Sequence, residues 1–111
     1  MLKEREKRTA EKYNIMGNIE NLHNDLLQIN RITEIDFDLD GFYDNMRQVI
    51  ILTKYDIPVT LENYFEVRRE LKQNVIEVAK ENGLTRTEDA IEDHGEWFYF
   101  VFKHDETWDK Q

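Results

Sequence analysis

Residues 34–44 read Glu-Ile-Asp-Phe-Asp-Leu-Asp-Gly-Phe-Tyr-Asp, and their alternation sets the architecture expected for the whole chain. Acidic residues occupy the even positions up to Asp40, and Ile35, Phe37 and Leu39 lie between them. Because successive side chains of a β-strand point to opposite faces of a sheet, this period of two predicts a strand over Arg31–Asp40. One face of that strand is apolar and needs helices to cover it, and the other face is acidic.

Two long helices are expected to cover the apolar face. A first helix is predicted over residues 3–29 by apolar residues spaced alternately by four and three, which are Ile15, Ile19, Leu22, Leu26 and Ile29. We expect this stripe to pack within its own domain and residues 1–12 to form a charged, solvated helical extension. A second helix is predicted over Leu61–Asn82, with Thr60 as its N-terminal cap and Gly83 ending it in the left-handed conformation.

The C-terminal third predicts the rest of the sheet. Residues 96–104 are rich in aromatic side chains, which favour strands, and with residues 88–93 they predict a hairpin around a His94-Gly95 turn. Residues 42–54 fit either a helix or a buried strand, and we favour the helix because residues 44–48 are poor strand material. Residues 105–111 are expected to be a tail, from which Trp108 can fold back onto the body.

The expected fold is therefore a single α+β domain over residues 1–111. It has two long helices packed on a small, mostly antiparallel sheet that includes the C-terminal hairpin. The 13 aromatic residues argue against a disordered chain, because they supply the apolar area that offsets chain entropy.

The net charge of -9 is concentrated in two segments. Residues 34–44 carry five acidic side chains and no basic one, and residues 88–109 carry eight acidic side chains against Lys103 alone. Such a field repels nucleic acid phosphates and attracts basic surfaces, so a basic protein partner is favoured over direct nucleic acid binding.

Several chemistries are excluded by composition. The chain contains no cysteine and no serine, which rules out disulfides, thiolate metal sites and nucleophilic Ser or Cys. It has no signal peptide pattern and no apolar run long enough for a membrane span, so we expect a cytoplasmic protein without membrane contact. We expect no cofactor, no dedicated metal site and no catalytic residue.

The acidic segment can also be compared with a calcium-binding EF-hand loop. Asp36, Asp38 and Asp40 would fill the first, third and fifth positions, Gly41 the sixth and Asp44 the ninth. The twelfth position is Arg47, where an EF-hand requires a bidentate glutamate. The loop interpretation is therefore disfavoured, although weak Ca²⁺ or Mg²⁺ binding through the three aspartates stays open as an alternative.

Residues 37–41, Phe-Asp-Leu-Asp-Gly, resemble the first motif of haloacid-dehalogenase-type phosphatases. The resemblance implies a nucleophilic Asp38, an acid/base Asp40 and a supporting Mg²⁺. Phe42 stands where that motif has threonine, and the chain has neither the long strand-helix alternation nor the late aspartate pair of that family. A small metal-dependent enzyme is therefore kept only as an alternative.

The favoured interpretation is a small acidic, non-catalytic binding protein that engages a basic surface of a larger partner. In its sharpest form it is a nucleic acid mimic that inhibits a nucleic-acid-binding enzyme, as anti-restriction and anti-CRISPR proteins of phages and mobile elements do. A further alternative is a homodimeric structural or assembly protein that associates through the first helix. The predicted partner-binding residues are Glu34, Asp36, Asp38, Asp40, Asp44, Glu92, Asp93, Glu96, Trp97 and Tyr99.

Overall fold

The computed structural model describes residues 2–42 and 47–108, with only the backbone described for residues 86–94 and Thr107. In chain order the elements are α1 (Glu4–Lys12), α2 (Met16–Leu27), β1 (Ile32–Asp38), β2 (Gln48–Tyr55), α3 (Tyr64–Glu81), β3 (Leu84–His94), β4 (Trp97–His104) and the 3₁₀ turn η1 (Glu106–Trp108). The strands form one antiparallel sheet in the order β1-β2-β4-β3. The predicted α+β class and the C-terminal strand pair are confirmed.

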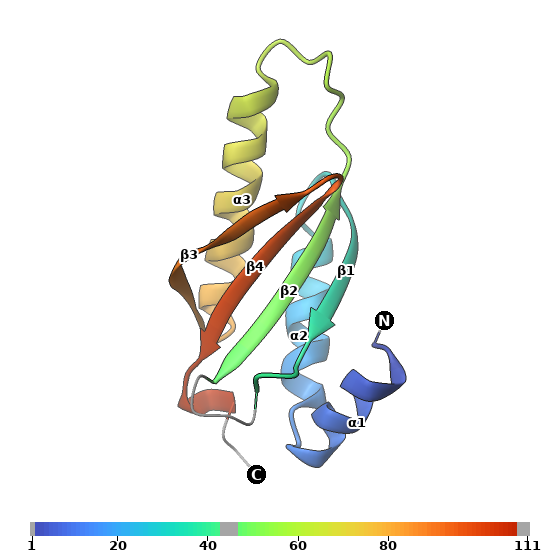
Figure 1. The fold of residues 1–111 in the computed structure, drawn as a ribbon, viewed down its shortest axis with the longest axis vertical. Coiled ribbons are helices and arrows are strands. Elements are labelled where there is room, and N and C mark those ends of the chain that lie inside the picture. Colours follow the sequence, from blue (N-terminus) through green and yellow to red (C-terminus); the bar gives the residue numbers. More distant parts are fainter. Residues whose placement is uncertain (1, 43–46, 109–111) are drawn as a thin grey trace.

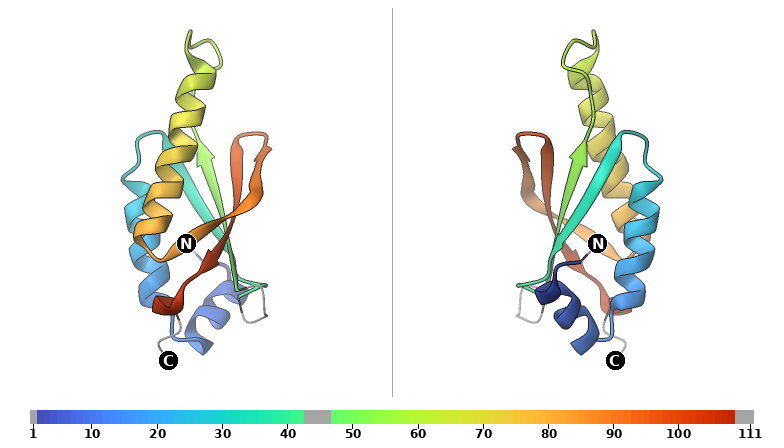
Figure 2. Two further views of the ribbon diagram at one scale, coloured as in Figure 1. Left: turned by 90° about the vertical axis from the view of Figure 1, so that its left-hand side faces the viewer. Right: turned by 90° about the vertical axis from the view of Figure 1, so that its right-hand side faces the viewer.

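Helices α2 and α3 lie side by side behind one face of this sheet (Figures 1 and 2). The alternation predicted for the acidic segment is confirmed, since Ile35, Phe37 and Leu39 are buried. Residues from β2, β4, α2 and α3 complete the core, among them Val49, Ile51, Phe98, Phe100, Phe102, Ile19, Leu22, Leu26, Leu71 and Val75. Each such side chain contributes about 1.5–3 kcal/mol by leaving water, so this closed face dominates the stability of the fold.

The prediction of one continuous helix over residues 3–29 is wrong, because the chain turns between α1 and α2. Asn14 has a left-handed φ of 56°, and the N–H groups of Asn14 and Ile15 donate to the carbonyls of Glu11 and Ala10 at 3.2 and 2.9 Å. These two hydrogen bonds form a Schellman motif, which ends helices. The apolar stripe itself is buried within the chain from Ile15 to Leu26, as predicted. Helix α1 is less solvated than expected, since Glu6 and Ala10 are buried.

The preference for a helix over residues 42–54 is wrong. Residues 48–55 form β2, which pairs with β1 on one side and β4 on the other. The run from Val49 to Thr53 is apolar except for its last residue and β-branched except for Leu52. A central strand accepts such a run because its inner face is buried and its outer face is half-buried. Residues 43–46, which carried part of that prediction, lie outside the described residues.

The second predicted helix begins later than expected. The residue that precedes α3 is Asn63, not Thr60. Residues 58–64 form tight turns, in which the N–H of Leu61 donates to the carbonyl of Pro58 and the N–H of Tyr64 donates to the carbonyl of Leu61. Its end is as predicted, with Gly83 at a φ of 83° and its N–H donating to Lys80. Among the helices of residues 2–42 and 47–108, none combines the length and the apolarity that a membrane crossing requires.

The C-terminal segment differs from the prediction in two details. The hairpin loop is Gly95-Glu96, because His94 still pairs with Trp97, and β3 begins earlier, at Leu84. Residues 105–108 are not a tail, since Trp108 is fully buried and its indole Nε1 donates to the carbonyl of Asn82 at 2.7 Å. A large aromatic group with a satisfied N–H is more stable in the core than in water.

Candidate functional site

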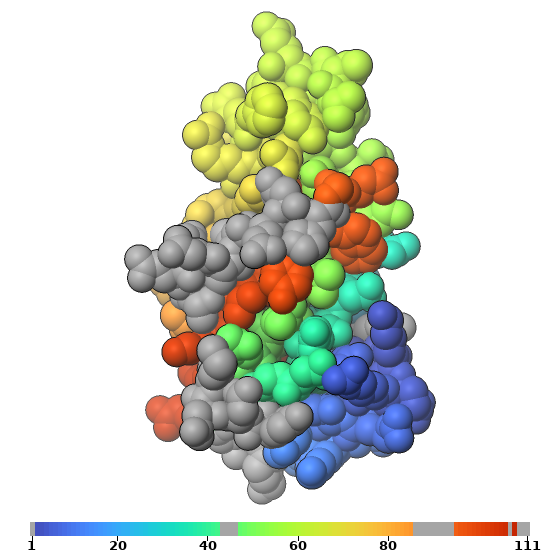
Figure 3. Space-filling view, viewed as in Figure 1, coloured from blue at the N-terminus to red at the C-terminus, as the bar shows by residue number. Residues whose placement is uncertain are grey.

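The face of the sheet turned away from α2 and α3, here called the outer face, is the candidate site. Its members are Glu34, Asp36 and Asp38 of β1, Ile50, Leu52 and Lys54 of β2, and Trp97, Tyr99 and Val101 of β4. All are half-buried except Glu34, which is exposed. Atoms of β1, β2 and β4 reach the molecular surface in Figure 3, and no described helix lies over them apart from α1 at the end of β1.

The strand register arranges the outer face in rows that run across the sheet. In the central row Asp36 pairs with Leu52 and Leu52 with Tyr99. The neighbouring rows are Glu34, Lys54, Trp97 and Asp38, Ile50, Val101. Each row therefore begins with a carboxylate on the edge strand and ends with an aromatic or aliphatic side chain on β4.

The structure brings five of the ten predicted partner-binding residues to this face, which are Glu34, Asp36, Asp38, Trp97 and Tyr99. On β4, Trp97 and Tyr99 lie on the outer face, whereas Phe98, Phe100 and Phe102 are in the core. Glu96 is exposed in the hairpin loop, with its Oε2 3.8 Å from Nζ of Lys54. Three predicted residues are not placed: Asp44 and the side chains of Glu92 and Asp93 lie outside the described residues.

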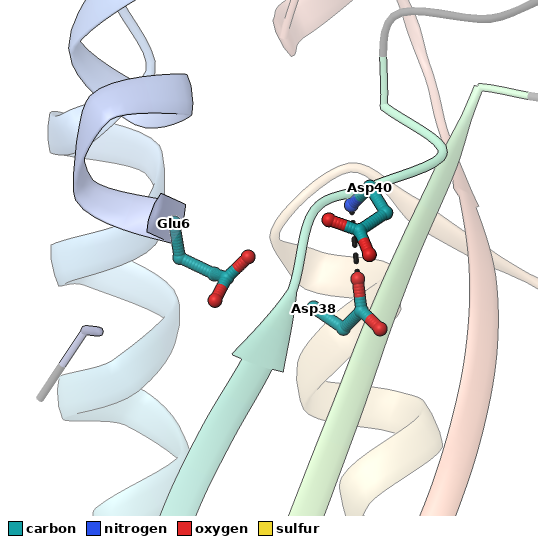
Figure 4. A group of neighbouring side chains, drawn as sticks. All are labelled: Glu6, Asp38 and Asp40. Atoms are coloured by element: carbon teal, nitrogen blue, oxygen red, sulfur yellow. Dashed lines mark hydrogen bonds between the residues drawn. The ribbon is translucent and has the colours of Figure 1, made fainter. Parts of the chain in front are cut away.

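A group of carboxylates lies where α1 meets the end of β1, and we name it the acid junction (Glu6, Asp38 and Asp40). One oxygen from each carboxylate lies within 4.8 Å of the others. The N–H of Asp40 donates to Oδ1 of Asp38 at 2.9 Å, which fixes the chain as it leaves β1. Figure 4 shows the Glu6 side chain extending from α1 towards this aspartate pair.

The environment of Glu6 disfavours its charge. The residue is only 7 % exposed. Burial raises the pKa of the Glu6 carboxyl, and the charges of Asp40 and Asp38 raise the pKa further, while Arg5 and Lys3 oppose them. Arg5 forms its ion pair with Asp40, since Nη2 of Arg5 lies 2.7 Å from Oδ2 of Asp40.

A hollow of about 380 Å³ connects the acid junction to the outer face. Its lining combines basic, acidic and apolar side chains, which are Lys3, Arg5, Glu6, Asp36, Phe37, Asp38, Asp40, Leu52 and Tyr99. Asp36, Leu52 and Tyr99 thus belong both to the central row and to the hollow. The outer face and the acid junction form one continuous surface.

Sequence reasoning missed Glu6 and Leu52. Glu6 stands among alternating charges in residues 3–12, where nothing distinguishes it from its neighbours. Leu52 belongs to the apolar run that was assigned to a helix. No signal in the sequence placed either residue beside Asp36 or Asp38, because the contacts cross between elements.

Neither the EF-hand loop nor the phosphatase motif has its family's structural context here. Asp36 and Asp38 are paired in β1, so the twelve-residue stretch from Asp36 to Arg47 is not a calcium loop, and Arg47 donates to the His104 carbonyl at 3.4 Å. The sheet is antiparallel, whereas strand-helix alternation of the phosphatase type produces parallel strands. The motif of residues 37–41 therefore occurs here in a different architecture.

Fold and site together define a small α+β protein with helices on one sheet face and an acidic, partly aromatic surface on the other. We compared the chain with models of known protein families, with curated proteins and with solved structures, and none of the three comparisons found a match.

Proposed function

We propose that this chain is a small, non-catalytic binding protein that docks its outer face onto a basic surface of a larger protein. The observation that carries the proposal is the row arrangement, in which each row runs from an edge-strand carboxylate across β2 to a half-buried aromatic or aliphatic side chain of β4. Aromatic side chains supply contact area at low entropic cost, and carboxylates steer a basic partner into register.

The size of the outer face indicates how much more of the protein takes part. Its rows extend roughly 14 Å along the strands and roughly 10 Å across them, which gives a flat area of roughly 140 Å². This area is well below the ~800 Å² that each partner buries in a stable interface. Helix α1 and the Gly95-Glu96 loop flank this face and extend the surface. We therefore expect Arg5 and Glu96 to lie at the rim of the interface and Leu52 and Tyr99 near its centre.

The most specific form of the proposal is a nucleic acid mimic. Carboxylates at every second residue of β1 are about 6.7 Å apart along the strand, so they form a regular row of negative charge. A protein groove that binds phosphates by Lys and Arg would accept such a row. The partner would then be a nucleic-acid-binding enzyme, and the activity an inhibition of the anti-restriction or anti-CRISPR type.

Acidic side chains on an edge strand also prevent pairing between copies of a protein. If preventing such pairing were their only role, the protein would retain no partner. The experiment therefore tests whether a partner is bound. We would attach the purified protein to beads, expose it to lysate of the source cells, and compare it with the double variant Glu34→Lys/Asp36→Lys. The double variant Glu70→Lys/Glu77→Lys on exposed positions of α3 makes the same change in net charge and is the matched control.

We expect a nucleic-acid-binding protein to be retained by the wild type and the α3 variant, displaced by duplex DNA, and lost from the β1 variant by at least about tenfold. Retention that falls equally in both variants would mean unspecific charge attraction. Retention by all three proteins, or of nothing at all, would also contradict the proposal.

A further inference from the structure

Glu6 is an unusual carboxylate because its side chain is largely buried, lines the hollow and lacks a partner among the described residues. It is 7 % exposed, and it accepts no hydrogen bond and forms no ion pair with any other described residue. A buried carboxylate is normally hydrogen-bonded or paired, since an uncompensated charge out of water is strongly destabilising. Figure 4 shows that it is directed at two further carboxylates, which increases its need for a positive charge.

The basic side chains nearby do not meet that need. Arg5 is bound to Asp40, and its side chain is 71 % exposed, so solvent screens its charge. Lys3 is among the residues that line the hollow and is also exposed. Three carboxylates therefore face two exposed basic side chains. The net charge at the acid junction is therefore negative when its three carboxylates are ionised.

The oxygens left over at the acid junction match the ligands of a hard cation. Oδ1 of Asp38 and Oδ2 of Asp40 are engaged, which leaves Asp38 Oδ2, Asp40 Oδ1 and both Glu6 oxygens without a partner among the described residues. Ca²⁺ binds oxygens at about 2.3–2.6 Å, so opposite ligands are about 5 Å apart, whereas Mg²⁺ needs about 4 Å. One oxygen of each of the three carboxylates lies within 4.8 Å of the others, a separation compatible with Ca²⁺ ligands.

We propose that Glu6, Asp38 and Asp40 form a Ca²⁺ site that joins α1 to the end of β1. The adjoining hollow of about 380 Å³ has room for the waters that would complete a coordination number of six to eight. This site uses Glu6 in place of Asp36, which distinguishes it from the loop that the aspartate spacing suggests. It does not depend on the proposed binding function.

An ion at this position would stabilise the N-terminal part of the fold. Helix α1 is separated from α2 by the turn at Asn14, and the ion would join it to a strand more than thirty residues away in sequence. Because the unfolded chain does not hold these carboxylates together, Ca²⁺ would bind the folded state preferentially and raise the melting temperature.

The test is calorimetric titration of the metal-stripped full-length protein with CaCl₂ and, separately, MgCl₂ in about 150 mM NaCl, a salt level that screens diffuse attraction. We expect one saturable Ca²⁺ site with a Kd of about 0.1–1 mM, as in other weak oxygen sites, and weaker Mg²⁺ binding. Glu6→Gln and Asp38→Asn should each weaken Ca²⁺ binding at least about tenfold. Asp36→Asn is the matched control, because it removes a charge from the same strand and the same hollow outside the junction.

A second measurement locates the ion independently of affinity. Paramagnetic Mn²⁺ should broaden the amide NMR signals of residues 5–7 and 38–40 before any others. Absence of saturable Ca²⁺ heat would overturn the proposal. So would an equal loss of binding in Asp36→Asn, or broadening spread evenly along β1, because either result describes a diffuse counterion atmosphere.

Discussion

The two faces of the sheet use neighbouring residues of the same strands and have opposite environments. On β4, Phe98, Phe100 and Phe102 are fully buried under α2 and α3, while Trp97 and Tyr99 between them are half-buried on the outer face. The inner face is occupied by the chain's own helices, so its aromatic groups contribute to stability. No helix covers the outer face in the described residues, and under our proposal its aromatic groups contact a partner. Stability and binding can therefore be changed separately by substituting adjacent positions.

The largest effect should come from the inner face. Phe100→Ala removes a fully buried ring that stacks on Phe102, with centroids 5.7 Å apart, and should lower the free energy of unfolding by about 3–5 kcal/mol. The neighbouring Tyr99→Ala should lower it by less than about 1 kcal/mol, because the site is already partly solvated. Urea unfolding followed by circular dichroism measures both values. Equal losses in the free energy of unfolding would contradict the prediction, because they would mean that the two faces contribute equally to stability.

An intermediate effect is expected where the inner core extends past the end of the sheet. Trp108→Phe keeps an aromatic group against Phe42 and removes the indole N–H that donates to Asn82. The carbonyl of Asn82 then loses this donor, so we expect a loss of about 1–3 kcal/mol in the same unfolding experiment. Lys103→Ala, an exposed change on β4, serves as the control and should be nearly neutral. A neutral Trp108→Phe would mean that the C-terminal segment adds little to the core.

The smallest effect concerns the buried charge beside the outer face. The pKa of Glu6 is raised in the folded protein above its ordinary value of 4.5, so its contribution to stability is fully present below that value and is lost as the pH rises through the folded pKa. In metal-free buffer, Glu6→Gln should thus be more stable than the wild type at neutral pH by about 0.5 kcal/mol, the size of a like-charge repulsion. The difference should vanish below about pH 4.

Urea unfolding of both proteins in EDTA at the two pH values makes that comparison. Glu4→Gln, an exposed change in the same helix turn, is the control and should not show the pH dependence. A Glu6→Gln variant that is less stable than the wild type at neutral pH would contradict the raised pKa and would indicate a favourable contact of the charged Glu6.

Part of the fold could be predicted because it depends on local pattern. The alternation around Phe37 separates polar from apolar side chains, so it specifies a strand and its inner face without further information. The stripe on α2 and the left-handed Gly83 after α3 are equally local. The break between α1 and α2 was also readable in principle, since asparagine tolerates the left-handed conformation that Asn14 adopts.

The errors arose where local pattern permits two answers. The run from Val49 to Thr53 is apolar at every position but the last, so neither helical nor strand periodicity is favoured, and pairing with both β1 and β4 made it a strand. Thr60 is a good capping residue in isolation, yet the turns after Pro58 moved the start of α3 beyond it. Glu6 gave no signal because its significance depends on residues more than thirty positions away.

The sequence by itself determined the α+β class, the acidic alternation of β1, the concentration of negative charge and the absence of thiol or serine chemistry, because these follow from composition and short periods. Only the tertiary structure decided that β4 turns Trp97 and Tyr99 outward rather than Phe98 and Phe100, because a period of two defines two faces and does not say which one the helices cover. It also decided that Glu6 meets Asp38 and Asp40, since packing, not periodicity, sets distances between elements.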